Sequence, residues 1–473
     1  MEEFLIANGD LFAKDGEPPG RTGIIKHKIN TGDAISIVQR AYRSNPRDRA
    51  FIQDEIKKLI QQGLIKESRS PWASPIVIVP KKNGKLRMCV DYRALNRVTK
   101  GDAYPLPRID DMLEALGKAS MFSSLDLASG FWQVEMDPDD QEKTAFTSHM
   151  GLYEFGVMPF GVTGGPATFQ RLMNIVYSGL AWAILLVYLD DTIVYSKGFN
   201  HHLQDLDQTF QRLRQANLRL NMSKCHFCMA ELAFLGHVVS GKGIVSDLKK
   251  IQAIKDYAIP TTVKEVQQFH GLATYYRRFV KNFAVIAAPL YQLFRGDQEF
   301  KWEEAQDKAF NQLKTFLINA PILAYPNTQA AMDGTRPFTI YTDACKDGLG
   351  AHLTQRGEDN KERAISYQSR GTNTHEKNYA PIDLELTAIT FGLKKFRPYV
   401  LGTKFTLYTD HQPLIPLIRS KEFTFGRIGR HLVKTMEFDG MEVHYKPGKT
   451  NVVADALSRI PTLNNYQPEE WTE

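Results

Sequence analysis

The chain has few cysteines and no long apolar run, and each shortage excludes a class of protein. Its four cysteines in 473 residues are too few and too scattered for a disulfide framework, so we interpret them as reduced thiols. The longest apolar run, residues 179–189, covers 11 residues and stops at two aspartates, whereas a membrane-spanning helix needs about 20. The first residues are acidic, unlike a secretory signal. We therefore expect an intracellular protein that does not enter a membrane.

The composition also excludes several non-globular classes. Hydrophobic residues make up 43% and charged residues 24% of the chain, which is ordinary for folded protein and unlike disordered, collagen-like or coiled-coil chains. We find no low-complexity tract and no internal repeat beyond a short echo of Tyr-Thr-Asp. The length is about three times the common domain size of roughly 150 residues, so we expect two or three domains.

Positive charge is concentrated near the amino terminus. Residues 1–110 hold 20 lysines and arginines against 13 acidic residues, and the remainder holds 39 against 40. A basic segment of this kind suits a polyanion such as nucleic acid, because each neutralised phosphate releases counterions. A solvated basic surface explains the same charge equally well.

Local patterns predict an alternation of helices and strands. Apolar residues at helical spacing predict an amphipathic helix over 51–62. Strands 75–80 and 86–90 flank a lysine-rich Asn-Gly turn and form a cationic hairpin. Further strands are predicted at 121–125, 184–188, 192–196, 338–342 and 405–409, with a helix at 383–396 and a helical region at 247–316. Residues 1–30 contain Gly and Pro without a clear period, so we expect them to be irregular.

Three aspartates follow predicted strands in the first half of the chain. Asp190 and Asp191 lie at a tight turn between two apolar strands, and Asp126 ends another strand. Adjacent carboxylates repel unless a cation compensates them, and Mg²⁺ prefers hard oxygen ligands of this kind. Three such carboxylates could hold two ions about 3.5 to 4 Å apart for in-line phosphoryl transfer. An exposed β-turn with two aspartates is the simpler alternative.

Several ordered motifs carry a resemblance to a known family. Tyr188-Leu189-Asp190-Asp191 resembles the Tyr-x-Asp-Asp box of reverse transcriptases. The surrounding blocks occur in the order found in gypsy-type (Metaviridae) LTR retroelement polymerases: Lys85–Asn96, Ser124–Gly130, Met158–Gly161, Pro166–Gln170 and Phe234–His237. The likeness extends over residues 25–459, which is much more specific than the Tyr-x-Asp-Asp box alone.

The resemblance implies a multidomain α/β and α+β chain, a right-hand polymerase followed by an RNase H-like α/β domain. The expected parts are an irregular lead-in (1–30), fingers and palm (31–240), a helical thumb (241–325), an RNase H domain (335–460) and a tail (461–473). In this family the residues matching Asp126, Asp190 and Asp191 bind the catalytic metals.

The resemblance also implies a nucleotide pocket. Lys82 or Lys85 and Arg87, on the cationic hairpin, would hold the incoming triphosphate, and the Arg fork suits this role. Phe131 matches the aromatic that sterically excludes a ribose 2′-hydroxyl, and Phe160 would line the pocket. Both rings could equally be plain core residues.

One motif departs from the family pattern. The family usually has Thr-Asn-Ala-Pro where this chain has Thr163-Gly164-Gly165-Pro166. The change removes a polar side chain near the pocket, so we expect retained catalysis with altered nucleotide selection.

Contacts to primer and template are expected from two further segments. The resemblance implies that Leu235 and Gly236 grip the primer end. Tyr276, Arg277 and Arg278 combine an aromatic with cations on one predicted helix, as in a thumb that follows a duplex. Half-buried aromatics with an exposed basic face would give the same pattern.

A second set of carboxylates lies in the last third of the chain. Asp343 and Asp410 end predicted strands, Glu385 lies in a helix, and Asp455 begins a helix after Asn451. Four carboxylates around two divalent ions could hydrolyse a phosphodiester, although four unrelated surface acids would look the same in this sequence. The blocks Tyr341–Ala344, Leu384–Leu386, Tyr408–His411 and Val453–Arg459 resemble the RNase H blocks of the same retroelements.

One position in this domain departs from many RNase H domains. They carry a histidine ten residues before the last aspartate, where this chain has Tyr445 beside His444. The step that this histidine serves is therefore expected to run differently or slowly.

Two weaker signals complete the candidates. Cys225 and Cys228 lack the second ligand pair that a structural zinc site requires, so we do not expect zinc. His201 and His202 are expected to face solvent at a helix start.

Taken with the resemblance, these residues predict an RNA- and DNA-dependent DNA polymerase with RNase H activity that serves retrotransposon replication. The expected cofactor is Mg²⁺, two ions per site, with Mn²⁺ as an alternative. The expected partners are an RNA template, a DNA primer, dNTPs and an RNA–DNA hybrid, with no membrane; a homodimer stays open. The resemblance implies a cytoplasmic location in virus-like particles.

Two rival functions are considered. The first is a domesticated, non-catalytic nucleic-acid-binding scaffold, which would not need two complete carboxylate sets. The second is an RNA-dependent RNA polymerase, which the bulky Phe131 and the RNase H blocks oppose. No protease or integrase is recognisable in the chain, so we expect a mature product of a polyprotein.

Overall fold

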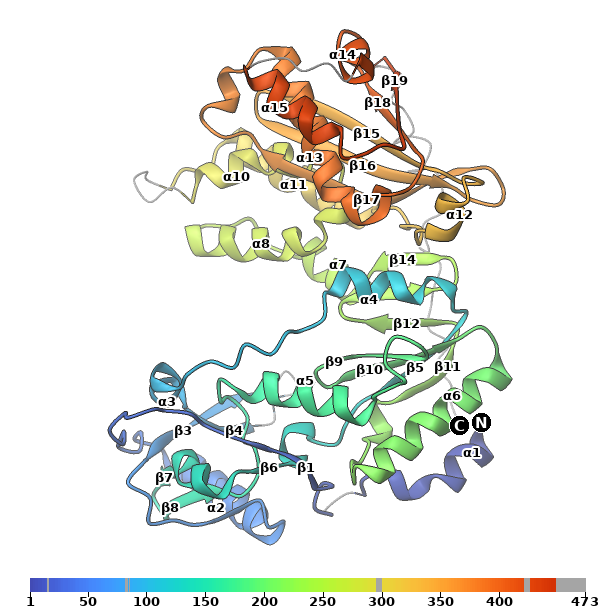
Figure 1. Ribbon diagram of the computed structural model, residues 1–473. Helices are drawn as coiled ribbons and strands as arrows, with labels where there is room; N and C mark the ends of the chain where they lie inside the picture. The colour runs from blue at the N-terminus through green and yellow to red at the C-terminus, as the bar shows by residue number, and fades with distance from the viewer. Residues whose placement is uncertain (15–16, 81–83, 85, 295–299, 421–425, 448–473) are drawn as a thin grey trace. The chain divides into compact units, whose positions relative to one another are not determined.

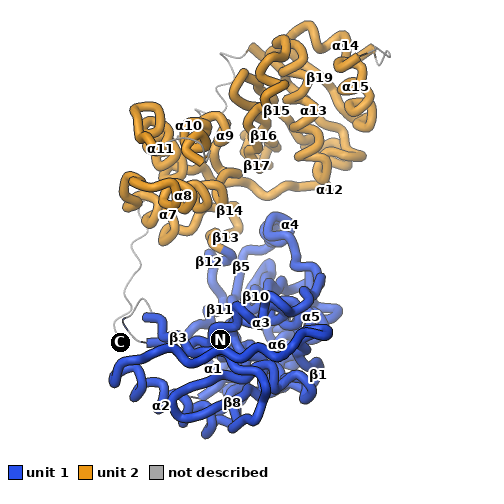
Figure 2. The backbone as a smooth tube through the Cα atoms, turned by 90° about the vertical axis from the view of Figure 1, so that its left-hand side faces the viewer, with its two compact units in different colours: residues 1–235 blue, residues 236–473 orange. Residues whose placement is uncertain are grey.

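The computed structural model describes residues 1–14, 17–80, 84, 86–294, 300–420 and 426–447. Its elements divide between two units, Met1–Leu235 and Gly236–Glu473, shown in blue and orange in Figure 2. Figure 1 labels helices and strands of both units where there is room.

A four-stranded antiparallel sheet carries the first set of aspartates in unit 1. Its strands, in the order β11-β5-β10-β9, are β11 (His226–Met229), β5 (Met121–Leu125), β10 (Asp191–Ser196) and β9 (Leu185–Tyr188). Helix α6 (Phe199–Gln215) packs on β5 and β10, and α5 (Gly165–Val176) packs on β9. Buried side chains of these elements form one core, which includes Leu125, Phe169 and Phe210. The predicted strands around the aspartates are thus confirmed.

A second sheet in unit 1 contains the predicted cationic hairpin. Its order is β2-β8-β7-β3-β4, with β2 (Ile65–Glu67), β8 (Gly151–Phe155), β7 (Phe146–Ser148), β3 (Ser74–Pro80) and β4 (Leu86–Val90). The hairpin is the antiparallel pair β3 and β4. Helix α2 (Pro46–Gln61) contributes Ile52, Ile56 and Leu59 to the core beside this sheet.

Helix α2 begins five residues before the predicted start. The side chain of Asn45 accepts a hydrogen bond of 2.8 Å from the Asp48 amide and so caps the helix, with Pro46 in the first turn. The first turn is polar, so the apolar period shows only from Phe51 onward.

The expectation that residues 1–30 are irregular is wrong. They form α1 (Glu2–Ala7), the short η1 (Gly9–Leu11) and β1 (Thr22–His27), which pairs in parallel with β6 (Val134–Met136). Phe4 stacks on Phe210 of α6 with ring centroids 5.4 Å apart. Packing onto a distant helix stabilises these short elements, and such contacts override local propensity.

The remaining elements of unit 1 are short. They are α3 (Arg93–Val98), α4 (Ile109–Ala115), η2 (Leu116–Lys118), η3 (Gly130–Gln133), η4 (Pro138–Thr144), η5 (Met222–Lys224) and β12 (Glu231–Phe234).

Unit 2 opens with a hairpin and a set of helices. The hairpin joins β13 (His237–Ser240) to β14 (Gly243–Ser246). The helices are α7 (Leu248–Lys255), α8 (Val263–Tyr275), η6 (Arg277–Phe279), α9 (Phe283–Ile286), α10 (Ala288–Gln292) and α11 (Glu304–Ile318). Helix α11 packs on α7, α9 and α10. The helical pattern predicted over 247–316 is confirmed.

A five-stranded mixed sheet forms the rest of unit 2. Its order is β17-β16-β15-β18-β19, with β17 (Glu362–Gly371), β16 (Gly348–Arg356), β15 (Phe338–Cys345), β18 (Phe405–Thr409) and β19 (Met441–Tyr445). Strands β15, β18 and β19 run parallel, while β16 and β17 are antiparallel to their neighbours. The other elements are α12 (Thr328–Met332), η7 (Glu376–Asn378), α13 (Pro381–Val400), α14 (Leu414–Ser420) and α15 (Gly426–Thr435).

The long helix α13 packs against the centre of this sheet. It contacts β15, β16 and β18, and its buried residues include Leu386, Ile389 and Leu393. The helix therefore carries Glu385 to the sheet. No helix in the described part of the chain combines the length and the apolar character that a bilayer crossing requires.

The expectation for His202 is also wrong. His202 does lie near the start of α6, but its side chain is buried, with 0% exposure. Its Nε2 lies 2.6 Å from Ser123 Oγ and its Nδ1 lies 3.0 Å from Ser196 Oγ. Ser196 donates its own proton to Asp205, so Nδ1 of His202 is the donor to Ser196 and Ser123 donates to Nε2. Burial lowers the pKa of His202 to about 4.

We predict that His202→Ala destabilises the protein by about 2–4 kcal/mol, because it removes two buried hydrogen bonds and leaves a cavity. The fold holds the neutral ring, so the stability contributed by His202 is complete above pH 6.5 and is lost as the pH falls towards about 4. Denaturant unfolding at several pH values measures both effects. The control is His201→Ala, at the neighbouring exposed position. Equal effects of the two substitutions would contradict this role for His202.

Candidate active sites

Strand pairing brings the first three aspartates to one end of the sheet in unit 1. Asp126 directly follows β5, Asp190 lies in the turn between β9 and β10, and Asp191 is the first residue of β10. Strands β5 and β10 are paired with Thr192 opposite Leu125. The three carboxylates therefore come from adjacent strand ends.

The turn before Asp190 has an unusual backbone conformation that a side chain from α5 supports. Leu189 has φ +54°, in the left-handed region that non-glycine residues rarely adopt. Its amide donates a 2.8 Å hydrogen bond to Gln170 Oε1, and Gln170 Nε2 donates to the Val187 carbonyl at 3.2 Å. Gln170 thus fixes both sides of the turn. In the sequence Gln170 appears only as the last residue of the Pro166–Gln170 motif, which gives no sign of this role.

The electrostatics of the aspartates favour a bound cation. Burial, with the nearby Asp126 and Asp191, raises the pKa of Asp190 to about 6. Burial and Asp126 also raise the pKa of Asp191. The buried Oδ1 of Asp190 has no hydrogen-bond partner among the described residues. An unpartnered buried carboxylate oxygen is costly unless a cation satisfies it.

The segment before β11 contacts Asp126 on two sides. Lys224 Nζ lies 3.2 Å from Asp126 Oδ1, and the Asp126 amide donates to Cys225 Sγ at 3.4 Å. The Lys224 side chain is 61% exposed, so this ion pair is accessible to solvent. Lys224 was not predicted from the sequence, because 98 residues separate it from Asp126. Cys225 packs against Asp126, and neither Cys225 nor Cys228 belongs to the candidate metal-binding group found among the described residues.

The predicted pocket aromatics form a stack. The Phe131 and Phe160 rings lie 5.4 Å apart at 14°, and Arg87 lies 5.1 Å above the Phe160 ring. Arg87 is exposed on β4. Lys82 and Lys85, predicted to hold the triphosphate, lie outside the described residues.

Gly164 and Gly165, where this chain departs from the family motif, allow close packing beside the stacked Phe131 and Phe160 rings. A Cβ at Gly165 would lie 3.3 Å from Phe131 Cε2, and a Cβ at Gly164 would lie 3.1 Å from His27 Cε1. His27 Nδ1 is in turn 2.9 Å from Thr168 Oγ1. The two glycines therefore let the Phe131 and His27 rings approach the start of α5.

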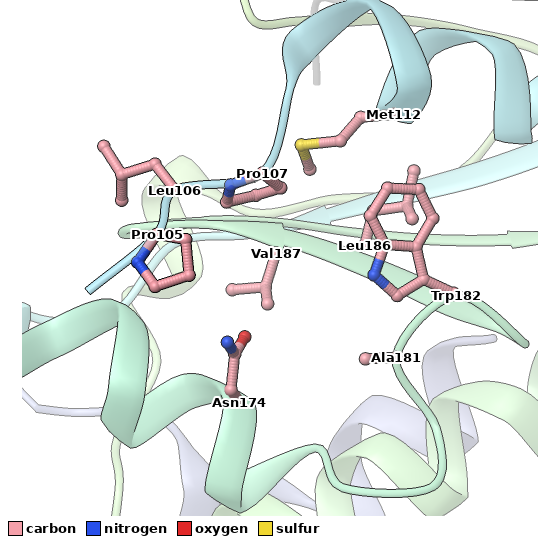
Figure 3. A pocket seen from close by; sticks show the side chains of 9 residues that line it. All are labelled: Pro105, Leu106, Pro107, Met112, Asn174, Ala181, Trp182, Leu186 and Val187. Carbon is pink, nitrogen blue, oxygen red and sulfur yellow. The ribbon is translucent and has the colours of Figure 1, made fainter. Parts of the chain in front are cut away.

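A cavity of about 240 Å³ lies beside β9, the strand that leads to Asp190 (Figure 3). Proline, leucine, valine and tryptophan side chains form most of its wall. Asn174 points into it and accepts a 3.0 Å hydrogen bond from Gln170, which supports the turn at Leu189. The cavity wall is thus connected to the aspartate turn.

The structure locates the residues predicted to contact primer and template. Leu235 and Gly236 both have positive φ, +46° and +71°. Tyr276 is 1% exposed and its hydroxyl donates a 2.7 Å hydrogen bond to the Gly236 carbonyl. Arg278 is 7% exposed, whereas Arg277 is exposed. Tyr276 and Arg278 are thus packed inside unit 2, and Arg277 is the exposed member of the three; their contact with a duplex stays a prediction.

The second candidate site brings three of the four predicted carboxylates together. Asp343 lies on β15, Asp410 follows β18, and Glu385 lies on α13. Each residue offers one carboxylate oxygen, and the three oxygens lie within 4.8 Å of one another. Among the described residues, this is the group of side chains close enough together to hold a metal ion. Asp455 lies outside the described residues. Tyr445, in place of the expected histidine, is 44% exposed on β19.

Glu385 has the most perturbed carboxylate of this group. Burial, with Asp410 and Asp343 nearby, raises the pKa of Glu385 to about 8, although a backbone hydrogen bond at Ala344 opposes the shift. The residue is 8% exposed, and its Oε2 has no hydrogen-bond partner in the described part of the chain. This arrangement also favours a bound cation.

Two segments of the chain match known protein families. Residues 79–239 match the family model of reverse transcriptase (RNA-dependent DNA polymerase). Residues 302–407 match the model of the RNase H-like domain found in reverse transcriptase. The first segment contains Asp126, Asp190 and Asp191, and the second contains Asp343 and Glu385.

Curated relatives are transposon polyproteins. The chain is 40% identical over 97% of its length to the retrovirus-related Pol polyprotein from transposon 297, and 37% identical over its full length to that from transposon gypsy, both of Drosophila melanogaster. It is 33% identical over 89% of its length to the transposon Tf2-3 polyprotein of Schizosaccharomyces pombe. It covers 43%, 46% and 31% of these relatives, so it spans less than half of each.

Solved structures support the fold. The foamy viral protease-reverse transcriptase in complex with dsDNA has a TM-score of 0.80 at 24% identity, covering 94% of this chain and 92% of that one. The same viral protein with an RNA/DNA hybrid has a TM-score of 0.76 at 23% identity, covering 99% and 62%. The expected order of a reverse transcriptase domain and an RNase H-like domain is confirmed.

We predict that Glu385→Gln stabilises the metal-free protein above pH 8 by a few degrees in unfolding temperature. The stability contributed by protonated Glu385 is complete below pH 4.5 and is lost as the pH rises through about 8, whereas glutamine stays neutral throughout. Mg²⁺ should raise the unfolding temperature of the wild type more than that of the variant. Thermal unfolding in EDTA and in Mg²⁺ measures this.

The control is Glu358→Gln, at a side chain that is 91% exposed, and it should leave both the pH dependence and the Mg²⁺ response unchanged. If the stability of the wild-type protein changed with neither pH nor Mg²⁺, the proposed cost of ionising Glu385 in the folded protein would be contradicted.

Proposed function

Since the chain belongs to the reverse transcriptases of gypsy-type LTR retrotransposons, we propose that its two carboxylate clusters catalyse DNA synthesis and RNA hydrolysis during retrotransposon replication. The polymerase cluster is Asp126, Asp190 and Asp191. The hydrolytic cluster is Asp343, Glu385 and Asp410, with Asp455 as the fourth carboxylate expected from the family.

One observation carries the proposal: each cluster contains a buried carboxylate oxygen that no described residue satisfies. These oxygens are Oδ1 of Asp190 and Oε2 of Glu385. Both residues also have raised pKa values caused by burial and by neighbouring carboxylates. Surface acids of no function would be solvated, and they would not gather like charges in partly buried positions.

The donor sets fit Mg²⁺, which binds carboxylate oxygens and retains water. We propose that each cluster holds two such ions and that Mn²⁺ can replace them. When bound, these ions would offset the charge of phosphate oxygens and lower the pKa of a coordinated hydroxyl or water.

In the polymerase site, the protein's own residues would bind and orient the nucleotide. Exposed Arg87 offers paired donors to a triphosphate, and the Phe160 ring under it limits where the guanidinium can lie. Phe131 stacks on Phe160 beside Gly130, where a Cβ would lie 3.3 Å from Asp190 Oδ1. The backbone next to Phe131 is therefore close to Asp190, and the proposed role of the ring is to limit the space available to a sugar.

The proposed substrates are an RNA or DNA template, a DNA primer, dNTPs and an RNA–DNA hybrid. The foamy viral neighbours were solved with dsDNA and with an RNA/DNA hybrid, which supports nucleic-acid duplexes as ligands. Family membership further leads us to propose that the protein acts in cytoplasmic virus-like particles.

A non-catalytic scaffold is the alternative that the experiments below must separate. A scaffold needs basic surfaces and gains nothing from two desolvated carboxylate clusters. It would bind duplexes without extending a primer or cutting a template.

We predict that Asp190→Asn lowers primer extension on the order of 10³-fold and leaves hybrid cleavage unchanged, and that Asp410→Asn has the reverse effect. The measurement is extension of a DNA primer on a labelled RNA template in Mg²⁺, with both strands followed. The matched controls, Asp54→Asn and Asp333→Asn, change exposed aspartates. Loss of both activities from either cluster variant would refute two separate sites, and duplex binding by a wild type without either activity would favour the scaffold.

We predict that Phe131→Ala lowers discrimination against ribonucleotides at least about tenfold, which corresponds to about 1.4 kcal/mol. The smaller side chain would admit a 2′-hydroxyl that the ring excludes. The measurement is the ratio of kcat/KM for dNTP and rNTP, which does not depend on the amount of folded enzyme. The control is Phe199→Ala, at a ring that is 43% exposed. An unchanged ratio in Phe131→Ala would remove the proposed role.

A further inference from the structure

Asn282 contacts the hydrolytic cluster from a different part of unit 2. It lies between η6 and α9, outside both segments that match family models. Its Nδ2 donates a 3.2 Å hydrogen bond to Oδ2 of Asp343. One catalytic carboxylate is therefore held by a side chain that the RNase H-like segment does not contain.

The backbone at Asn282 suits asparagine. The residue has φ +54° and ψ 29°, the left-handed conformation, and it precedes the first residue of α9. Asparagine and glycine adopt this conformation more readily than other residues do. Only asparagine of these two carries an amide that can donate to Asp343.

Helix α9 is fixed to the sheet that carries Asp343. The Ala284 amide donates a 3.0 Å hydrogen bond to Ser369 Oγ on β17. On β16, a Cβ at Gly348 would lie only 2.6 Å from Val285 Cγ2. The helix therefore sits on the sheet at a position where β16 carries no side chain.

A second glycine of β16 makes room for the Asn282 side chain itself. Gly350 lies opposite Asp343 in the β15–β16 register. A Cβ at Gly350 would collide with Asn282 Oδ1. The amide thus lies against the backbone of β16 next to the Asp343 carboxylate, with little freedom to move.

A neutral amide has a different effect on this carboxylate from that of a lysine. It donates to one oxygen and fixes the carboxylate rotamer, yet it brings no positive charge that would compete with a divalent ion. An oxygen of Asp343 lies within 4.8 Å of an oxygen of Glu385 and of Asp410.

We propose that Asn282 is a positioning residue of the hydrolytic site, which orients the Asp343 carboxylate for divalent cation binding. The inference rests on the proposed function of that cluster as a metal-dependent ribonuclease site. It makes the helical segment before residue 302 part of the hydrolytic machinery. Groups that orient metal ligands typically change metal affinity or activity by 10–100-fold when removed.

Two substitutions separate the amide from the backbone role. Asn282→Gly keeps the left-handed conformation and removes the donor. Asn282→Asp keeps the size and shape of the side chain, but it replaces the amide donor with an acceptor facing Asp343. The matched control is Asn360→Asp, because Asn360 also has positive φ, +58°, and is exposed on a turn of the same unit.

The first measurement is hybrid cleavage and primer extension by the full chain. We expect both Asn282 variants to lower the kcat of cleavage at least about tenfold with an unchanged KM for the hybrid, and to leave primer extension intact. Substitution of a residue that contacts the hybrid would instead raise the KM for the hybrid. Wild-type kcat in both variants would overturn the proposal, and Asn360→Asp should behave as the wild type.

The second measurement is Mn²⁺ binding by electron paramagnetic resonance, in an Asp190→Asn, Asp191→Asn background that weakens the polymerase cluster. We expect Asn282→Gly to lower Mn²⁺ affinity about tenfold. A loss of affinity in a protein that never cleaves hybrids would keep the positioning role and refute the hydrolytic function. Unchanged Mn²⁺ affinity together with unchanged cleavage would refute the positioning role of Asn282 and keep the hydrolytic function. Absence of Mn²⁺ binding in the wild type would refute both the positioning role and the hydrolytic function.

Discussion

Repulsion between partly buried carboxylates is the constraint on which both sites depend. In each cluster, carboxylates from different elements meet, so strand pairing and helix packing must hold like charges together against their own repulsion. Burial, and after it the neighbouring carboxylates, raises the pKa values of Asp190 and Glu385, which expresses the cost of this arrangement. A protein gains from such an arrangement only if a cation releases the strain, which is why the clusters indicate function and not merely acidic surface.

The two clusters share a design but use different partners. Each has one carboxylate held by a donor from a neighbouring segment: Lys224 contacts Asp126, and Asn282 contacts Asp343. Lys224 brings a positive charge that repels a bound cation. Its side chain is 61% exposed, so there is space in the solvent for it to move away from Asp126. Asparagine is neutral and packed against Gly350, so it stays in place. The donor beside Asp126 is therefore exposed to solvent, whereas the donor beside Asp343 is packed against the sheet.

The strands that carry the aspartates could be predicted from the sequence, because an apolar strand pattern is local. That Glu385 on α13 belongs with Asp343 and Asp410 was implied by the family resemblance alone. The supporting side chains could not be predicted. Gln170 lies 19 residues from the amide it fixes, and Lys224 and Asn282 lie 98 and 61 residues from their aspartates. His202 and Tyr276 show the same limit, since an ordinary polar or aromatic residue on a helix gives no sign of which distant groups will bury it. Helix α1 also depends on such a contact, through Phe4 and Phe210.

Three non-glycine residues with a strained backbone lie beside the two clusters. Leu189 precedes Asp190, Ser129 lies beside Gly130, and Asn282 faces Asp343, and all three have positive φ. A non-glycine residue in that region can cost about 1–3 kcal/mol, and it persists only where its surroundings determine it. Gln170 does this for Leu189, and the packing of α9 on β17 does it for Asn282. At Leu189 and Asn282 the chain thus turns sharply where it brings a carboxylate, or the donor that orients one, into a cluster.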